Sequence, residues 1–149
     1  MSYEKISNSN KLINIQMRCE NVKDIETFSK SDPFVRIFRV SNMTNLNVPA
    51  EDLGDNDWRE AHSTEHVNDN LNPKFLPFEI SSASLCSGNP NAHIKFEIWD
   101  HSNKGEHKLI GKVCSSLAKI MSGQRRLDTF DMKRKPAGTI IFDNIFESV

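Results

Sequence analysis

Short runs in which apolar and polar residues alternate recur along this chain, and they constrain its fold more than any other feature. The alternation covers residues 13–19 and returns in residues 94–99. Successive side chains of a β-strand point to opposite faces, so a period of two predicts strands with one buried face. No long stretch shows the 3.6-residue period of an amphipathic helix. The pattern therefore favours a fold built of strands.

Further strands are expected where short apolar runs lie between turn-forming residues. Residues 33–40 carry apolar side chains on both faces, which predicts a central strand, whereas Pro77 predicts an edge or a bulge in its run. One or two helical turns are expected in residues 115–121. About eight short strands favour an all-β fold, an eight-stranded antiparallel β-sandwich. The remaining runs are 59–67, 75–85, 109–113, 126–132 and 139–146.

Length and charge limit the class of protein. The chain has 149 residues, which suggests one folded domain, expected over residues 11–149 after an N-terminal extension at residues 1–10. Its 19 basic and 20 acidic residues nearly cancel, so no global field favours nucleic acid as a partner. No apolar run approaches the roughly 18 residues that a membrane span needs.

The cysteines and the N-terminus predict a cytoplasmic protein. Cys19, Cys86 and Cys114 are odd in number and widely spaced, so they are expected to be reduced thiols at core positions. The first residues are polar and lack the apolar core of a secretory signal.

No catalytic motif emerges from the sequence. GxSxG, Walker and HExxH patterns are missing, so we expect no enzyme activity. His62 and His66 are four residues apart, which would suit a metal pair on a helix. Their segment is predicted to be a strand, so both are interpreted as surface residues.

Two aspartates mark the ends of predicted strands. Asp32 closes a polar loop directly before the run 33–40, and Asp100 follows the run 94–99. Carboxylates at the loop ends of two strands are a way for a sandwich to build a calcium pocket. The alternative for Asp32 is a local turn in which its carboxylate accepts a backbone N–H.

Several segments, in this order and spacing, resemble the C2 domain, a calcium- and lipid-binding β-sandwich, and within that family they are most similar to the copines. The resemblance covers about residues 11–146, and the chain has room for one such sandwich. It is carried by Lys30–Phe34, by Asn70-Leu71-Asn72-Pro73 with Phe75, by Ser84–Cys86, by Asp100–Gly111 and by Gly138-Thr139-Ile140.

The resemblance implies a degraded calcium site. The family's five aspartate positions fall on Glu26, Asp32, Asp100, Ser102 and Lys108. Three carboxylates and one ammonium leave these positions with a formal charge of −2, where five aspartates would carry −5. Calcium affinity follows the number and charge of the oxygen ligands, so we expect calcium binding to be weak or absent.

Two alternatives concern the same loops. Lys108 could bridge Asp32 and Asp100 in place of the ion. Neighbouring side chains could instead supply oxygens, namely Asp24, Asn103 and Glu106.

The resemblance also suggests residues that contact lipid. Phe28 lies in the loop before Asp32, where it either inserts into a membrane or packs the loop onto the sandwich. Lys104 lies in the loop after Asp100. Lys133, Arg134 and Lys135 form a basic cluster before the last strand, and each cation near an anionic leaflet contributes about 1 kcal/mol. The alternative for this cluster is an ordinary solvated loop.

Two functions remain open. The first is a non-catalytic module that docks peripherally on anionic phospholipid. The second is a calcium-independent protein-interaction or scaffold subunit, for which the long insert at residues 42–57 is a candidate contact element.

Overall fold

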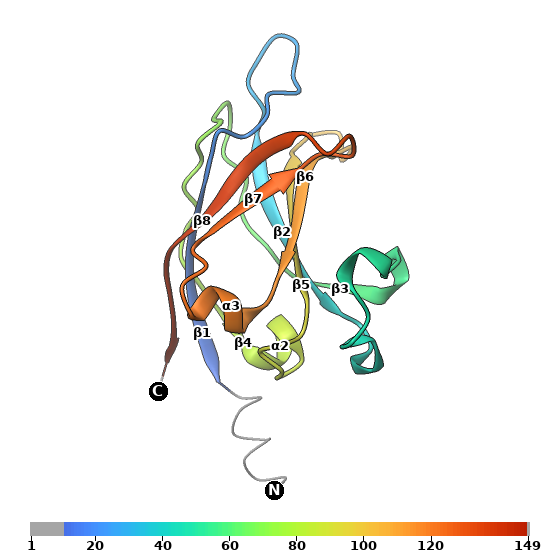
Figure 1. Cartoon of the computed structure of the whole chain (residues 1–149). Helices are drawn as coiled ribbons and strands as arrows, with labels where there is room; N and C mark the ends of the chain where they lie inside the picture. Colours follow the sequence, from blue (N-terminus) through green and yellow to red (C-terminus); the bar gives the residue numbers. More distant parts are fainter. Residues whose placement is uncertain (1–10, 149) are drawn as a thin grey trace, which may run out of the picture.

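Eight antiparallel strands form the body of the fold within residues 11–148, the part of the chain that the computed structural model describes (Figure 1). The predicted extension at residues 1–10 lies outside the described residues. Short helical segments join some of the strands: η1 (Met43–Asn45), η2 (Ala50–Asp52), η3 (Asp55–Asp57), α2 (Ser82–Cys86) and α3 (Leu117–Met121). The strands are β1 (Leu12–Glu20), β2 (Pro33–Val40), β3 (Trp58–Ser63), β4 (Phe78–Ser81), β5 (Ile94–Asp100), β6 (Lys108–Ser115), β7 (Arg126–Phe130) and β8 (Pro136–Ser148).

The strands follow the order β3-β2-β5-β6-β7-β8-β1-β4. A single residue pair, Lys112 with Phe130, joins β6 to β7, so the sheet turns there into two four-stranded layers. Phe96 of β5 meets Phe142 of β8 edge to face, with ring centroids 5.6 Å apart. The two layers therefore share one core, and the predicted eight-stranded sandwich is confirmed.

The period of two explains which side chains fill that core. Ile13, Ile15, Met17 and Cys19 of β1 are buried, whereas the residues between them face outward. At position 111 of β6, the packing of the two layers leaves no space for a side chain. A Cβ at this position would lie 2.6 Å from the Cβ of Ala137 and 2.7 Å from Oγ1 of Thr129, so only glycine lets the layers approach this closely.

The run 75–85 is only partly a strand. β4 ends at Ser81, whose hydroxyl accepts the N–H of Ser84 and caps helix α2. The expectation of a strand through residue 85 is therefore wrong, because a serine N-cap competes with strand pairing. The edge position predicted from Pro77 is confirmed, since β4 pairs with β1 alone.

Two further expectations need correction. The strand expected over 59–67 stops at Ser63, and Thr64 turns inward, where its hydroxyl accepts the N–H of Val35. Cys114 is exposed and does not fill a core position, whereas Cys19 and Cys86 are buried.

Three connections lie at one end of the sandwich, at the top in Figure 1. We call residues 21–32, between β1 and β2, loop one, and residues 101–107, between β5 and β6, loop three. Residues 131–135, between β7 and β8, form the basic turn. We call this end of the molecule the loop end. None of the helices within residues 11–148 is long and apolar enough to cross a bilayer.

Candidate functional site at the loop end

The pairing of β2 with β5 brings the two predicted aspartates together. Pro33 lies opposite Asp100, so Asp32 is the first residue beyond the paired strands. The backbone N–H of Asp32 donates to Oδ1 of Asp100 at 2.8 Å, and the N–H of His101 donates to the carbonyl of Asp32 at 2.9 Å. Asp100 is only 3% exposed. One of its oxygens thus holds loop one onto the end of β5.

Asp32 also uses one carboxylate oxygen within the protein. Its Oδ1 accepts the N–H of Asp69 at 2.7 Å, and Oδ1 of Asp69 accepts the N–H of Lys30 at 3.1 Å. These bonds tie loop one to the segment between β3 and β4. The carboxylate of Asp32 therefore braces loop one against that segment. The N–H that it accepts is not local in sequence, so this contact is not the local turn that was the alternative to metal ligation.

Glu26 turns toward the same place. Its carboxyl hydrogen-bonds to Asp100, which is the largest cause of a raised pKa for Glu26, followed by repulsion from the negative charge of Asp100. Lys108 acts in the opposite direction through its positive charge.

Lys108 lies opposite Asp100 in the pairing of β5 with β6. No ion pair within 4.0 Å joins Lys108 to a carboxylate anywhere in residues 11–148. The bridge expected between Asp32 and Asp100 is therefore not made by Lys108. The backbone N–H of Asp32 and the carboxyl of Glu26 contact Asp100 instead.

Most of the predicted metal positions line one cavity of about 340 Å³ at the mouth of loop three. Ser102 is engaged inside the loop, where its hydroxyl accepts the N–H of Lys104 at 3.2 Å. Among the described residues, no three His, Cys, Asp or Glu side chains gather closely enough to hold a metal ion. The lining residues are Glu26, Asp100, Ser102, Asn103, Lys104, Glu106 and Lys108.

Loop one presents a fully exposed aromatic side chain. Phe28 is 100% exposed, so the alternative in which it packs the loop onto the sandwich is wrong. Ile25 has that packing role, since it is half-buried against the core. The loop is thus held at Ile25 and Ser31, whose hydroxyl accepts the N–H of Ile25, while its tip stands in solvent.

The basic turn is shaped by an aspartate that sequence reasoning missed. Oδ1 of Asp131 accepts the N–H groups of Lys133 and Lys135, each at 2.9 Å. Nζ of Lys23 in loop one lies 2.8 Å from the other oxygen, and this contact is the main reason why the pKa of Asp131 is lowered to about 2. The basic turn is therefore fastened to loop one.

The three cations of the basic turn lie in solvent. Lys133, Arg134 and Lys135 are exposed and form no ion pair with a described carboxylate. Met132 beside them is 77% exposed. The sequence carried a signal for this turn, an aspartate followed closely by three cations and Pro136, but residues 126–132 were assigned to a strand.

The two histidines of loop three stack together with His66. The rings of His66 and His101 are parallel with centroids 3.7 Å apart, and His107 follows at 4.8 Å from His101. His62 lies elsewhere, half-buried on the ring of Phe78. His62 and His66 therefore have different ring partners, although β3 ends at Ser63 and His66 lies beyond it. His66 is exposed as interpreted, whereas His62 is half-buried.

A family model for the C2 domain matches residues 11–132. This chain belongs to the C2 domain family. The solved structure of BON1-C2B is similar to this C2 domain, with 24% identity and a TM-score of 0.74 over 95% of this chain and 94% of that one. A structure of the first C2 domain, domain A, of plant extended synaptotagmin 1 has 16% identity and a TM-score of 0.59, over 90% and 95% of the two chains.

A calcium-bound structure of two C2 domains, A and B, of extended synaptotagmin 2 is also similar. Its identity is 18% and its TM-score 0.53, over 90% of this C2 domain and 45% of that chain. At these identities the likeness concerns the fold.

Proposed function

We propose that this C2 domain is a non-catalytic module that docks on anionic phospholipid surfaces through its loop end. One observation carries the proposal: the fully exposed Phe28 stands at the same end as the unpaired cations of the basic turn. An apolar tip and a set of cations are what a headgroup layer over hydrocarbon can accommodate. Lys104 in loop three adds a further exposed cation at this end.

The expected strength of docking follows from these side chains. Fully burying a phenylalanine side chain contributes about 1.5–3 kcal/mol. Each cation close to an anionic leaflet adds about 1 kcal/mol, and salt screens this contribution. The sum supports weak, reversible and salt-sensitive attachment. We accordingly propose a cytoplasmic protein that is peripheral to membranes.

The proposal includes a degraded calcium site, because the donor set at the loop end does not fit the ion. Asp32 and Asp100 each use one oxygen on a backbone N–H, and Glu26 shares a hydrogen bond with Asp100. Ser102 and Lys108 occupy positions where the family carries carboxylates. Calcium takes six to eight oxygen ligands, so docking here should not depend on calcium.

The copine likeness is part of the same proposal. It is supported by the order and spacing of the motifs from Lys30 to Ile140. These motifs lie at the exit of loop one, in the connection before β4, in helix α2, along loop three with the start of β6, and near the start of β8.

Sedimentation with phosphatidylserine vesicles tests this function. The protein should pellet at low salt equally well with calcium and with chelator, and much less at moderate salt. Vesicles of phosphatidylcholine alone are the control and should not carry it down. Pelleting that requires calcium would show that the proposed site is wrong. No pelleting in any buffer would reject membrane docking itself.

A gain-of-function variant tests the degraded site independently. Ser102→Asp with Lys108→Asp restores two carboxylates and removes one ammonium at the cavity. Calorimetry should then detect calcium binding that the wild-type chain lacks. Thr27→Asp with Lys30→Asp, in loop one, makes the same change of charge outside that cavity and is the matched control. Equal calcium affinity of the two double variants would refute the assignment of positions 102 and 108.

A further inference from the structure

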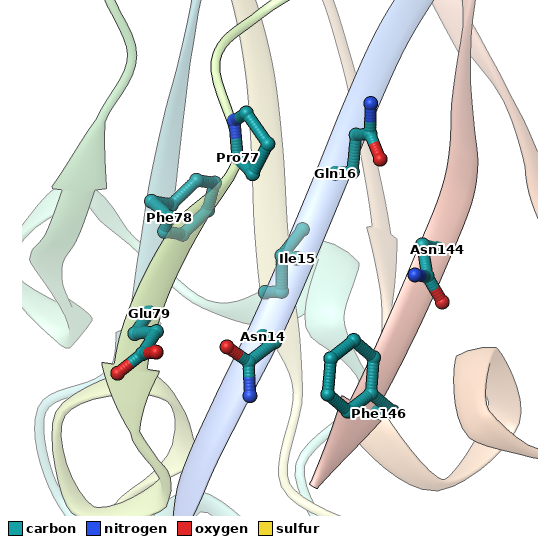
Figure 2. Close-up of a pocket in the computed structure, with 8 residues that line it drawn as sticks. All are labelled: Asn14, Ile15, Gln16, Pro77, Phe78, Glu79, Asn144 and Phe146. Atoms are coloured by element: carbon teal, nitrogen blue, oxygen red, sulfur yellow. The ribbon is translucent and has the colours of Figure 1, made fainter. Parts of the chain in front are cut away.

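A groove crosses the outer face of the layer formed by β7, β8, β1 and β4, away from the loop end. It has a volume of about 410 Å³ and runs over β4, β1 and β8 (Figure 2). β1 begins at the opposite end of the sandwich from loop one, and the groove lies over its first half. A ligand here would leave Phe28 and the basic turn free. The lining residues are Asn14, Ile15, Gln16, Pro77, Phe78, Glu79, Asn144 and Phe146.

Strand register explains why these side chains meet. Asn14 of β1 lies between Phe146 of β8 and Glu79 of β4, so the three form one row across the layer. Gln16 lies opposite Asn144 in the next row toward the loop end. Figure 2 shows the two amides of β1 between Phe146 on one side and Pro77 on the other.

The groove offers apolar surface together with unused hydrogen-bonding groups. Phe146 is 46% exposed, although most large apolar side chains of the described residues are buried. Gln16 and Asn144 make no side-chain hydrogen bond within residues 11–148. Each amide can both donate and accept, which matches the N–H and C=O groups of an extended peptide.

The charges in and around the groove indicate which charge a ligand should carry. Around the groove, Arg18 pairs with Asp143 at 3.0 Å and Lys11 pairs with Glu147 at 3.4 Å. Glu79, in the groove, has no cation within 4.0 Å among the described residues. The groove therefore carries one uncompensated negative charge beside an aromatic side chain.

We infer that this groove binds an extended segment of a partner protein that carries an apolar side chain next to a lysine or arginine. The apolar side chain packs between Phe146 and Pro77, the cation meets Glu79, and the amides of Gln16 and Asn144 bond to the peptide backbone. A volume of about 410 Å³ lies within the roughly 300–1,000 Å³ range of binding pockets. The inference does not depend on the proposed membrane docking, because it uses a separate surface.

Peptide selection tests the inference. A phage-displayed library of random peptides is panned on the chain and counter-selected on the Phe146→Ser variant. The enriched peptides should share an apolar residue beside lysine or arginine. A fluorescent synthetic peptide of that consensus should bind in an anisotropy titration. Phe146→Ser should weaken its binding about tenfold or more, as truncation of a central aromatic anchor does.

Charge and specificity have their own controls. Glu79→Gln should weaken the same peptide about three- to tenfold at low salt and less at high salt. Phe130→Ser is the matched control for Phe146, since Phe130 is 45% exposed on β7. Glu106→Gln, in loop three, is the control for Glu79. Both controls should bind the peptide as the wild type does, and circular dichroism should show all four variants folded.

The inference would be overturned if the panning gave no peptide consensus, or if Phe146→Ser and Phe130→Ser bound the peptide equally. Self-association of the chain in sedimentation that Phe146→Ser abolishes would overturn it too, because a second copy would then fill the groove. Binding of neutral glycans on an array, without peptide binding, would also reject it. Phe146→Ser and Glu79→Gln should pellet with phosphatidylserine vesicles as the wild type does. A failure of the groove can thus be told apart from a failure of membrane docking.

Discussion

Two surfaces of this C2 domain combine aromatic and basic side chains, yet they differ in how those side chains are used. On the outer face of β2 and β5, Nε of Arg36 lies 2.8 Å from Glu60, and its guanidinium lies 5.1 Å from the ring centres of both Phe38 and Trp99. At the loop end, the cations of the basic turn form no ion pair with a described carboxylate, and Phe28 is fully exposed.

Lys95 makes the difference clear. Its ammonium lies 3.3 Å from the carboxylate of Glu97 and within 5 Å of the rings of Phe38 and Trp58. An external anion could bind there only by breaking contacts that already exist. Composition alone therefore does not identify a binding surface; the partners of each cation inside the protein decide whether it is free to bind.

The largest expected effect concerns Lys95→Ala. The change leaves the carboxylate of Glu97, whose side chain is only 9% exposed, without its cation. Breaking a buried ion pair by removing one partner costs about 3–5 kcal/mol, and partial exposure places this case nearer 2–3 kcal/mol. Urea unfolding measures the loss, and vesicle binding of the folded protein should not change. Lys133→Ala is the control and should leave the free energy of unfolding within about 0.5 kcal/mol of the wild type.

Substitutions in the basic turn should lower vesicle affinity and leave the free energy of unfolding unchanged, the reverse of Lys95→Ala. Lys133→Gln, Arg134→Asn and Lys135→Gln together remove three exposed cations, and at about 1 kcal/mol each vesicle affinity at low salt should fall about a hundredfold. Asparagine is chosen at position 134 because its φ is +62°, which asparagine tolerates. Sedimentation at several salt concentrations measures both the affinity and its salt dependence. An unchanged salt dependence would mean that other cations face the membrane.

Phe28→Ser tests the apolar contribution. Vesicle affinity should fall about ten- to a hundredfold, because the side chain loses roughly 1.5–3 kcal/mol of burial in the membrane. The free energy of unfolding should stay the same, since Phe28 is fully exposed in the protein. Phe38→Ser is the matched change on the other surface and should lower stability while leaving vesicle affinity intact. Similar effects of the two substitutions on vesicle binding would remove the distinction between the surfaces.

The strands and the meeting of Asp32 with Asp100 could be predicted because they depend on local pattern. Alternation sets the buried face of β1, and an aspartate at a strand exit lies at the sheet's end whatever the rest of the chain does. Helix α2 was missed because Ser81 suits a strand end and a helix cap equally well.

The partners of the charged side chains could not be predicted. Lys108 lies opposite Asp100 without pairing with it, because Asp100 accepts a backbone N–H that no side-chain pattern reveals. Phe28 had two interpretations because exposure depends on which residue of loop one packs, and Ile25 takes that place. The groove on β1 joins strands that are far apart in the sequence, so only the register brings Phe146 beside Asn14.

The smallest expected effect concerns Asp131, where the loop end does use a cation internally. Contact with Lys23, more than the backbone N–H of Lys135, lowers the pKa of Asp131 from its ordinary 3.8 to about 2. A lowered pKa means that the ionised form stabilises the fold above pH 3.8, and this contribution is lost as pH falls through about 2. An NMR titration of the wild type should give the low value, and Lys23→Gln should raise it toward 3.8. Since this pair fastens the basic turn to loop one, Lys23→Gln should also weaken vesicle binding slightly. If the pKa of Asp131 stayed unchanged in that variant, the N–H groups of the turn itself would be what lowers it.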